Sequence, residues 1–112
     1  MRRTALITGA SAGLGAEFAR QLAARDLDLV LVARRAERLE QIGRALRVRH
    51  GVDVHCIEGD LAEREVPERI HAELAGRGTQ IDWLVNNAGA SGPNLLEKPG
   101  FEQHARFMEL MM

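Results

Sequence analysis

Three glycines near the amino terminus offer a turn that could hold a phosphate group. Gly9, Gly13 and Gly15 lie in the segment TGASAGLG at residues 8–15, directly after a short apolar run. Glycine adopts positive φ without strain and lets a phosphate approach the backbone with no Cβ in the way. Leu14 opens a stretch with helical spacing, and the unpaired N–H groups of a helix start attract a pyrophosphate. The turn therefore predicts a dinucleotide site; the alternative is a glycine-rich strand–helix turn that binds nothing.

Two arginines follow the second apolar run and bear on the choice of dinucleotide. Arg34 lies 19 positions after Gly15 (34 − 15), close to the offset of about 20 residues at which such folds contact the adenosine ribose. An acidic residue there would bind the ribose of NAD(H), but the residues are Ala33, Arg34 and Arg35. Guanidinium groups pair well with phosphate, so Arg34 and Arg35 favour NADP(H) over NAD(H). The alternative is a solvated arginine pair at a helix start.

Apolar runs and helical spacing predict the elements that position these residues. Strands are expected over residues 5–8, 27–32, 52–57 and 81–85, and helices over about 14–25, 35–50, 63–75 and 101–112. This alternation implies the α/β class, with a doubly wound parallel sheet, right-handed crossovers and helices on both faces. The third strand alternates polar with apolar residues, which suits a sheet edge. The glycine turn then lies at the carboxyl end of the sheet, where such folds bind ligands.

Four motifs in chain order resemble those of the short-chain dehydrogenase/reductase family. TGASAGLG at residues 8–15 is similar to the family motif T-G-x-x-x-G-x-G, and Arg34 is similar to the basic residue of NADP-preferring members. Asp60-Leu61 resembles the family's adenine-binding pair, and NNAG at residues 86–89 resembles its N-N-A-G motif. The resemblance implies a Rossmann-type sheet, here incomplete, with about four strands in the order 3-2-1-4. It also implies one NADP(H)-binding domain over residues 1–112.

The resemblance gives each motif a role at the cofactor. Asp60 would accept a hydrogen bond from the adenine amino group and the Leu61 N–H would donate to a ring nitrogen; the alternative for Asp60 is a helix N-cap. Ser11 would assist at the 2′-phosphate, although Ala12 is not basic and so a second NADP marker is absent. The expected cofactor-binding residues are Gly9, Ser11, Gly13, Leu14, Gly15, Arg34, Arg35, Asp60, Leu61, Asn87, Ala88 and Gly89.

The asparagines of the fourth motif have a structural as well as a binding interpretation. The side chains of Asn86 and Asn87 can bind neighbouring backbone groups and tie the end of the fourth strand to the first strand. The resemblance adds that the backbone of this motif approaches the cofactor ribose, with Gly89 leaving the space. The alternative is a purely structural turn.

The catalytic pair of the family is absent from this sequence. The family uses a tyrosine, followed four residues later by a lysine, to exchange a proton with a carbonyl or alcohol while the nicotinamide moves hydride. This chain has no tyrosine, and Lys98 is its single lysine, so no catalytic residue is assigned. We expect the cofactor-binding half of an oxidoreductase acting on small carbonyl or alcohol substrates, truncated before the catalytic half. The alternative is a non-catalytic nucleotide-binding or interaction module.

Composition and charge argue against several other classes. A net charge of −1 argues against nucleic acid as a partner, and no segment has the roughly 18 apolar residues of a membrane helix. Cys56 is the only cysteine, which fits a reducing, cytoplasmic setting. His50, His55, Cys56 and His71 match no standard zinc spacing, so no metal is expected. An unpaired outer edge of the fourth strand and an apolar helix from Phe101 predict self-association.

Overall fold

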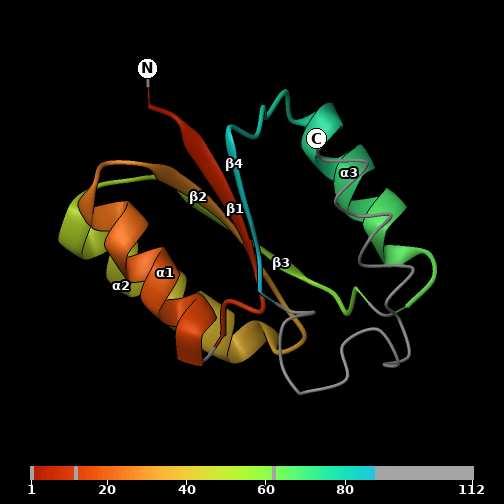
Figure 1. The fold of residues 1–112 in the computed structure, drawn as a ribbon, viewed down its shortest axis with the longest axis horizontal. Coiled ribbons are helices and arrows are strands. Elements are labelled where there is room, and N and C mark those ends of the chain that lie inside the picture. Colours follow the sequence, from red (N-terminus) through yellow and green to blue (C-terminus); the bar gives the residue numbers. More distant parts are fainter. Residues whose placement is uncertain (1, 12, 62, 88–112) are drawn as a thin grey trace.

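Strands and helices alternate throughout the described chain (Figure 1). The computed structural model describes residues 2–11, 13–61 and 63–87. Their elements are β1 (Thr4–Thr8), α1 (Gly13–Ala24), β2 (Asp28–Ala33), α2 (Ala36–His50), β3 (Val54–Glu58), α3 (Val66–Gly76) and β4 (Trp83–Asn86). The loop and helix expected beyond Asn87 lie outside the described residues. No helix within the described ranges is long and apolar enough to cross a membrane.

The strands form one parallel sheet in the order β3-β2-β1-β4, which confirms the expected topology. β1 is central: Thr8 at its end stands opposite Val32 of β2 on one side and Asn86 of β4 on the other. β3 is at the edge, as its alternating pattern predicts. The carboxyl ends of three strands therefore meet at the point where the glycine turn begins.

Helices cover both faces of the sheet, as expected for a doubly wound fold. Figure 1 shows α1 and α2 together on one face and α3 on the other. On the first face, Ile7 and Leu31 pack with Ala19 of α1 and Leu39 of α2. On the second face, a separate apolar cluster joins the sheet to α3 through Leu6, Val30, Val32, Ile57, Leu61, Val66, Ile70 and Leu74. Buried on both faces, β1 and β2 are nearly continuously apolar.

The starts of α3 and β3, like that of β4, which begins at Trp83 rather than at residue 81, differ by two residues or more from the sequence prediction. α3 begins at Val66 rather than at residue 63, because the Glu63 N–H bonds the Asp60 carbonyl in a turn and Pro67 takes the first helical turn. β3 begins at Val54 rather than at residue 52, because the Asp53 N–H bonds the Asp28 carboxylate instead of joining the ladder. None of these shifts moves the carboxyl end of a strand, so the expected site is unaffected.

Candidate functional site

The glycine turn brings the start of α1 very close to the end of β1. Gly9 and Gly13 have φ of 62° and 59°, the left-handed region that favours glycine. A Cβ on Gly15 would lie 2.1 Å from the Gly9 carbonyl oxygen and 2.9 Å from Nδ2 of Asn87. The third glycine is therefore required for the close packing of helix on strand that the spacing predicts. Leu14, between these glycines, is exposed.

Three elements fasten the turn in place. The Ala10 N–H donates to the Val32 carbonyl at the end of β2, at 3.2 Å. Nδ2 of Asn87 donates to the Gly9 carbonyl at 3.4 Å. Nε of Arg38, in the first turn of α2, donates to the Ser11 carbonyl at 2.7 Å. Sequence reasoning missed Arg38, whose one signal was its position four residues after Arg34, near the start of the predicted helix.

The fourth motif ties β4 to β1, as predicted. The hydroxyl of Thr8, which is fully buried, donates to Oδ1 of Asn86 at 2.9 Å. Asn87 reaches the turn itself through the bond to Gly9. Both asparagines therefore have a structural role. Ala88 and Gly89, the rest of the motif, lie outside the described residues.

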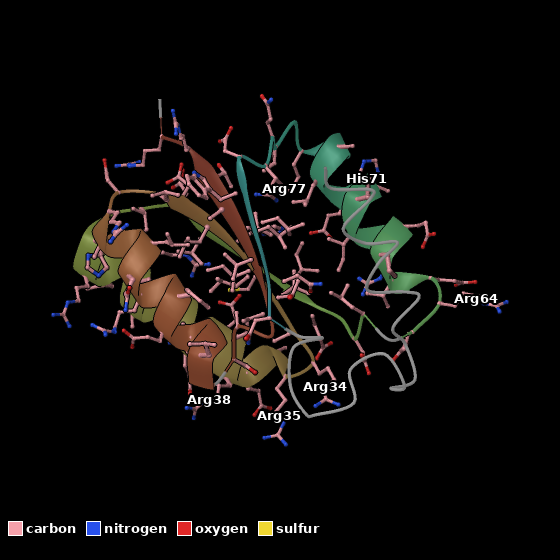
Figure 2. All side chains as sticks on the ribbon, in the orientation of Figure 1. Arg34, Arg35, Arg38, Arg64, His71 and Arg77 are labelled. Carbon is pink, nitrogen blue, oxygen red and sulfur yellow. The ribbon has the colours of Figure 1, made fainter. Side chains whose placement is uncertain are left out.

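A basic cluster, formed by Arg34, Arg35 and Arg38, stands beside the turn. Figure 2 shows the three side chains at the same end of the sheet, directed away from the core. Arg35 is the N-cap residue of α2 but makes no side-chain capping bond. Among the described residues, the guanidinium groups of Arg34 and Arg35 have no hydrogen-bond or ion-pair partner. An open hollow of about 470 Å³ adjoins the cluster, lined by Arg35, Ala36, Glu37, Arg38, Gln41 and Glu58.

Asp60 and Leu61 follow β3 at the same end of the sheet. The ladder continues past the strand, because the Gly59 N–H donates to the Ala33 carbonyl at 2.9 Å. The Leu61 side chain is buried in the α3-side core, and Asp60 is partly buried. Asp60 is not the N-cap residue of α3, which is Glu65. The main chain of this pair lies at the sheet end that also carries the turn and the basic cluster.

Comparisons with known proteins agree with this geometry. The sequence model of the short chain dehydrogenase family matches residues 3–112. The chain belongs to the short-chain dehydrogenase family. It is 40% identical over 96 residues to human 17-beta-hydroxysteroid dehydrogenase type 3, covering 86% of this chain and 30% of that protein. It is 39% identical over 88 residues to the very-long-chain 3-oxoacyl-CoA reductase of Anas platyrhynchos, covering 78% of this chain and 28% of that protein.

Solved structures of short-chain dehydrogenases have the same arrangement of strands and helices. A short-chain dehydrogenase from Sphingobium yanoikuyae in complex with NADPH matches with a TM-score of 0.77 and 32% identity, over 97% of this chain and 46% of that one. L-sorbose reductase from Gluconobacter frateurii, complexed with NADPH and L-sorbose, matches with a TM-score of 0.79 and 29% identity, over 98% and 44%. The chain thus spans less than half the length of these two proteins.

His55 and Cys56 lie on β3, apart from the glycine turn. Nε2 of His55 lies 2.6 Å from Oε2 of Glu73, which links β3 to α3. Cys56 projects to the opposite face, where its thiol lies 3.6 Å from the Leu39 carbonyl of α2. Burial, with the nearby Glu40 carboxylate, raises the pKa of Cys56 to about 11, so the thiol is unreactive at neutral pH. The described residues bring no three metal-ligating side chains together.

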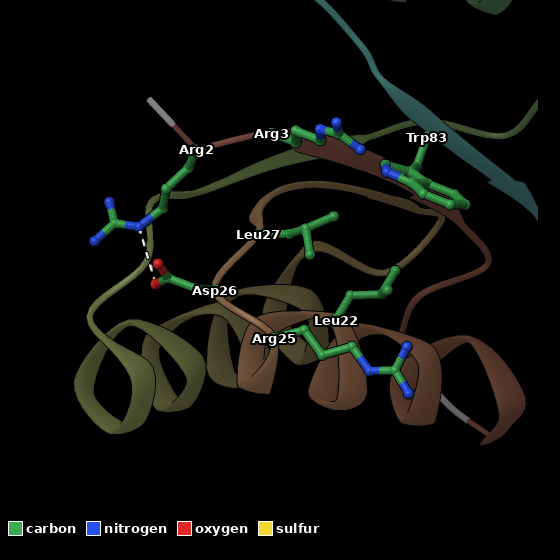
Figure 3. A pocket seen from close by; sticks show the side chains of 7 residues that line it. All are labelled: Arg2, Arg3, Leu22, Arg25, Asp26, Leu27 and Trp83. Atoms are coloured by element: carbon green, nitrogen blue, oxygen red, sulfur yellow. Dashed lines mark hydrogen bonds and ion pairs between the residues drawn. The ribbon is translucent and has the colours of Figure 1, made fainter.

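A second hollow lies at the amino end of the sheet (Figure 3). It encloses about 710 Å³ and is lined by Arg2, Arg3, Leu22, Arg25, Asp26, Leu27 and Trp83. Arg2 is already paired with Asp26 at 3.1 Å. Arg2 and Arg3 precede β1 whereas the glycine turn follows it, so this larger hollow is remote from the expected cofactor site.

Proposed function

We propose that the chain is the cofactor-binding part of an NADP(H)-dependent oxidoreductase that moves hydride between NADP(H) and a small carbonyl or alcohol substrate. The observation that carries this proposal is the meeting of the glycine turn with Arg34 and Arg35 at one end of the sheet. The two related structures described above are complexes with NADPH. The alternative of a non-catalytic module has no observation in its favour beyond the absent tyrosine.

The pyrophosphate would lie at the start of α1. The first turn of this helix, from Gly13, carries no acidic side chain, so its positive end is not neutralised from within the helix. Gly9 and Gly13 leave the backbone accessible, and Gly15 keeps the helix start close to β1. Backbone N–H groups held this way suit a diphosphate bridge.

The adenosine half would extend from the turn toward the ends of β2 and β3. Arg34 and Arg35 present charged groups suited to the 2′-phosphate. Ser11 would assist there, and its carbonyl is bonded to Arg38, the third residue of the basic cluster. Asp60 and the Leu61 N–H would bind the adenine ring. Asn87 would lie near the ribose, together with Ala88 and Gly89.

The nicotinamide ring of bound NADP(H) would supply the hydride. The residues of this chain bind and orient the cofactor, and none is assigned to proton transfer because the sequence has no tyrosine. The identity of the substrate would be set by residues outside this site.

A fluorescence titration with NADPH and NADH tests the proposal. Arg34→Asp places an acid where the 2′-phosphate would lie, and should weaken NADPH binding by about 10- to 100-fold, the range for loss of a charge-assisted hydrogen bond of 1.5–3 kcal/mol. NADH binding should hold or improve. Arg44→Asp, on the exposed part of α2, makes the same charge change away from the turn and serves as control. Wild-type protein that binds neither cofactor would refute the proposal; a variant that still prefers NADPH would refute the role of Arg34.

We also propose that the chain self-associates through the outer edge of β4 and works in the cytoplasm. Trp83 on this strand is 53% exposed, and no further strand pairs with β4 within the described ranges. The free thiol of Cys56 suits a reducing compartment. Cell fractionation would test the location, and the association is tested below.

A further inference from the structure

Arg38 is an exposed arginine whose hydrogen-bond partner is a main-chain carbonyl in another segment of the chain. Its Nε donates to the main-chain carbonyl of Ser11, which lies 27 residues earlier in the chain. The 2.7 Å distance is that of a short, charge-assisted bond. The bond joins the first turn of α2 to the glycine turn, two segments that lie far apart in the sequence.

The Ser11 carbonyl that Arg38 binds lies between two other points at which the turn is held. Gly9 and Gly13, which precede and follow Ser11 in the chain, both have positive φ, and glycine is the residue with the widest choice of backbone conformations. The Ala10 N–H is held by β2 and Gly15 is packed against Gly9, but Ser11 lies between these anchors. The Arg38 bond therefore supplies the restraint at Ser11, the residue of the turn expected beside the 2′-phosphate.

We propose that Arg38 is a positioning residue: it holds the glycine turn in its binding conformation before NADP(H) arrives, an inference that rests on the proposed function. Holding the turn in advance lowers the ordering cost of binding. Since both dinucleotides carry the pyrophosphate that the turn cradles, loss of Arg38 weakens both. Loss of a ligand to the 2′-phosphate, such as Arg34, weakens NADPH alone.

Arg38→Met tests this role, because methionine keeps an apolar stem and removes every donor. We expect NADPH and NADH binding to weaken by a similar factor, about 3- to 10-fold, which is the effect of one net hydrogen bond. High salt should leave the loss in place, since salt screens a through-space charge effect but not a direct bond. Arg44→Met, on the same helix, is the charge-matched control and should bind as wild type. Arg38→Lys keeps the charge without the planar donor and should recover little affinity.

Amide hydrogen exchange in the cofactor-free protein gives a second readout. Arg38→Met should speed exchange in the peptide spanning the turn and leave α3 unchanged. Weakening of NADPH alone, full recovery in Arg38→Lys, or unchanged exchange at the turn would each overturn the proposal. Failure of the wild type to bind either cofactor would refute the proposed function instead, and the exchange measurement would still test the restraint.

Discussion

Gly15 lies where the glycine turn leaves no space for a larger side chain. Gly15→Ala would place a Cβ 2.1 Å from the Gly9 carbonyl oxygen, a backbone atom that cannot move without shifting the turn. We expect a loss of about 3 kcal/mol in the free energy of unfolding, the upper part of the range for overpacking. Cofactor affinity should fall in parallel, because α1 must move away from β1. Urea unfolding followed by circular dichroism measures the first effect, and fluorescence titration the second.

Gly76→Ala is the matched control for this substitution. Gly76 ends α3, and nothing lies within 4 Å of the Cβ that alanine would add. Alanine there should raise the free energy of unfolding by about 0.4–1 kcal/mol, because it restricts the unfolded chain. If Gly15→Ala proved as stable as Gly76→Ala, the close approach of α1 to β1 would be wrong.

Residues of the turn differ in how far sequence could predict them. Gly9, Gly13 and Gly15 could be predicted because positive φ and close approach leave glycine as the residue that fits. The contact of Arg38 could not be predicted, because its acceptor is the main-chain carbonyl of Ser11. Because every residue has a main-chain carbonyl, the amino-acid type of the acceptor residue gives no indication of this bond.

At the scale of elements, the packing of α2 on β3 can be probed through Cys56. Its thiol lies under α2 at the Leu39 carbonyl, and burial raises its pKa from 9.0 to about 11. At pH 8 the thiolate fraction is then about one in a thousand, against about one in ten for a thiol with the ordinary pKa. We expect iodoacetamide to react about 100-fold more slowly with the folded chain than with the urea-unfolded chain.

The pH dependence of the iodoacetamide reaction shows whether the pKa of Cys56 is raised or lowered in the folded protein. The rate for the folded protein should keep rising through pH 10, whereas the rate for the unfolded chain should level off above pH 9. A double variant, Cys56→Ser with Val48→Cys, moves the thiol from β3 to a site on α2 that is 83% exposed. That thiol should react at the ordinary rate in the folded protein. Equal rates for Cys56 folded and unfolded would show that α2 does not cover β3 as described.

Element order was easier to predict from sequence than element starts. The strand order followed from the strand–helix alternation and the family resemblance, and the end of α2 followed from Gly51, which has φ of 69° and bonds the Arg47 carbonyl. The start of α3 could not be placed, because the residues before Pro67 have helical composition but form a turn. Tertiary contacts, such as that of Asp28 with the Asp53 N–H, decide such boundaries.

At the scale of the whole molecule, the sheet separates two ends with different chemistry. The carboxyl ends of β1, β2 and β3 carry the turn, the basic cluster and Asp60. The amino ends carry the second hollow and the exposed indole of Trp83. Within the described ranges, β4 pairs with β1 alone and is therefore an edge strand of the sheet. Trp83 is its first residue, so the exposed indole lies on this edge strand.

The edge of β4 predicts association that depends on protein concentration. Trp83 is 53% exposed and is the single tryptophan of the chain, so its fluorescence reports on this edge directly. Emission should move to shorter wavelength as concentration rises, together with the average mass from light scattering. Trp83→Lys should suppress the rise in mass, because a charged residue at a sheet edge disfavours strand pairing. Val48→Lys adds the same charge at a site on α2 that is 83% exposed, and should leave the association unchanged. A constant monomer mass in the wild type, or equal suppression by both variants, would show that the β4 edge does not drive self-association.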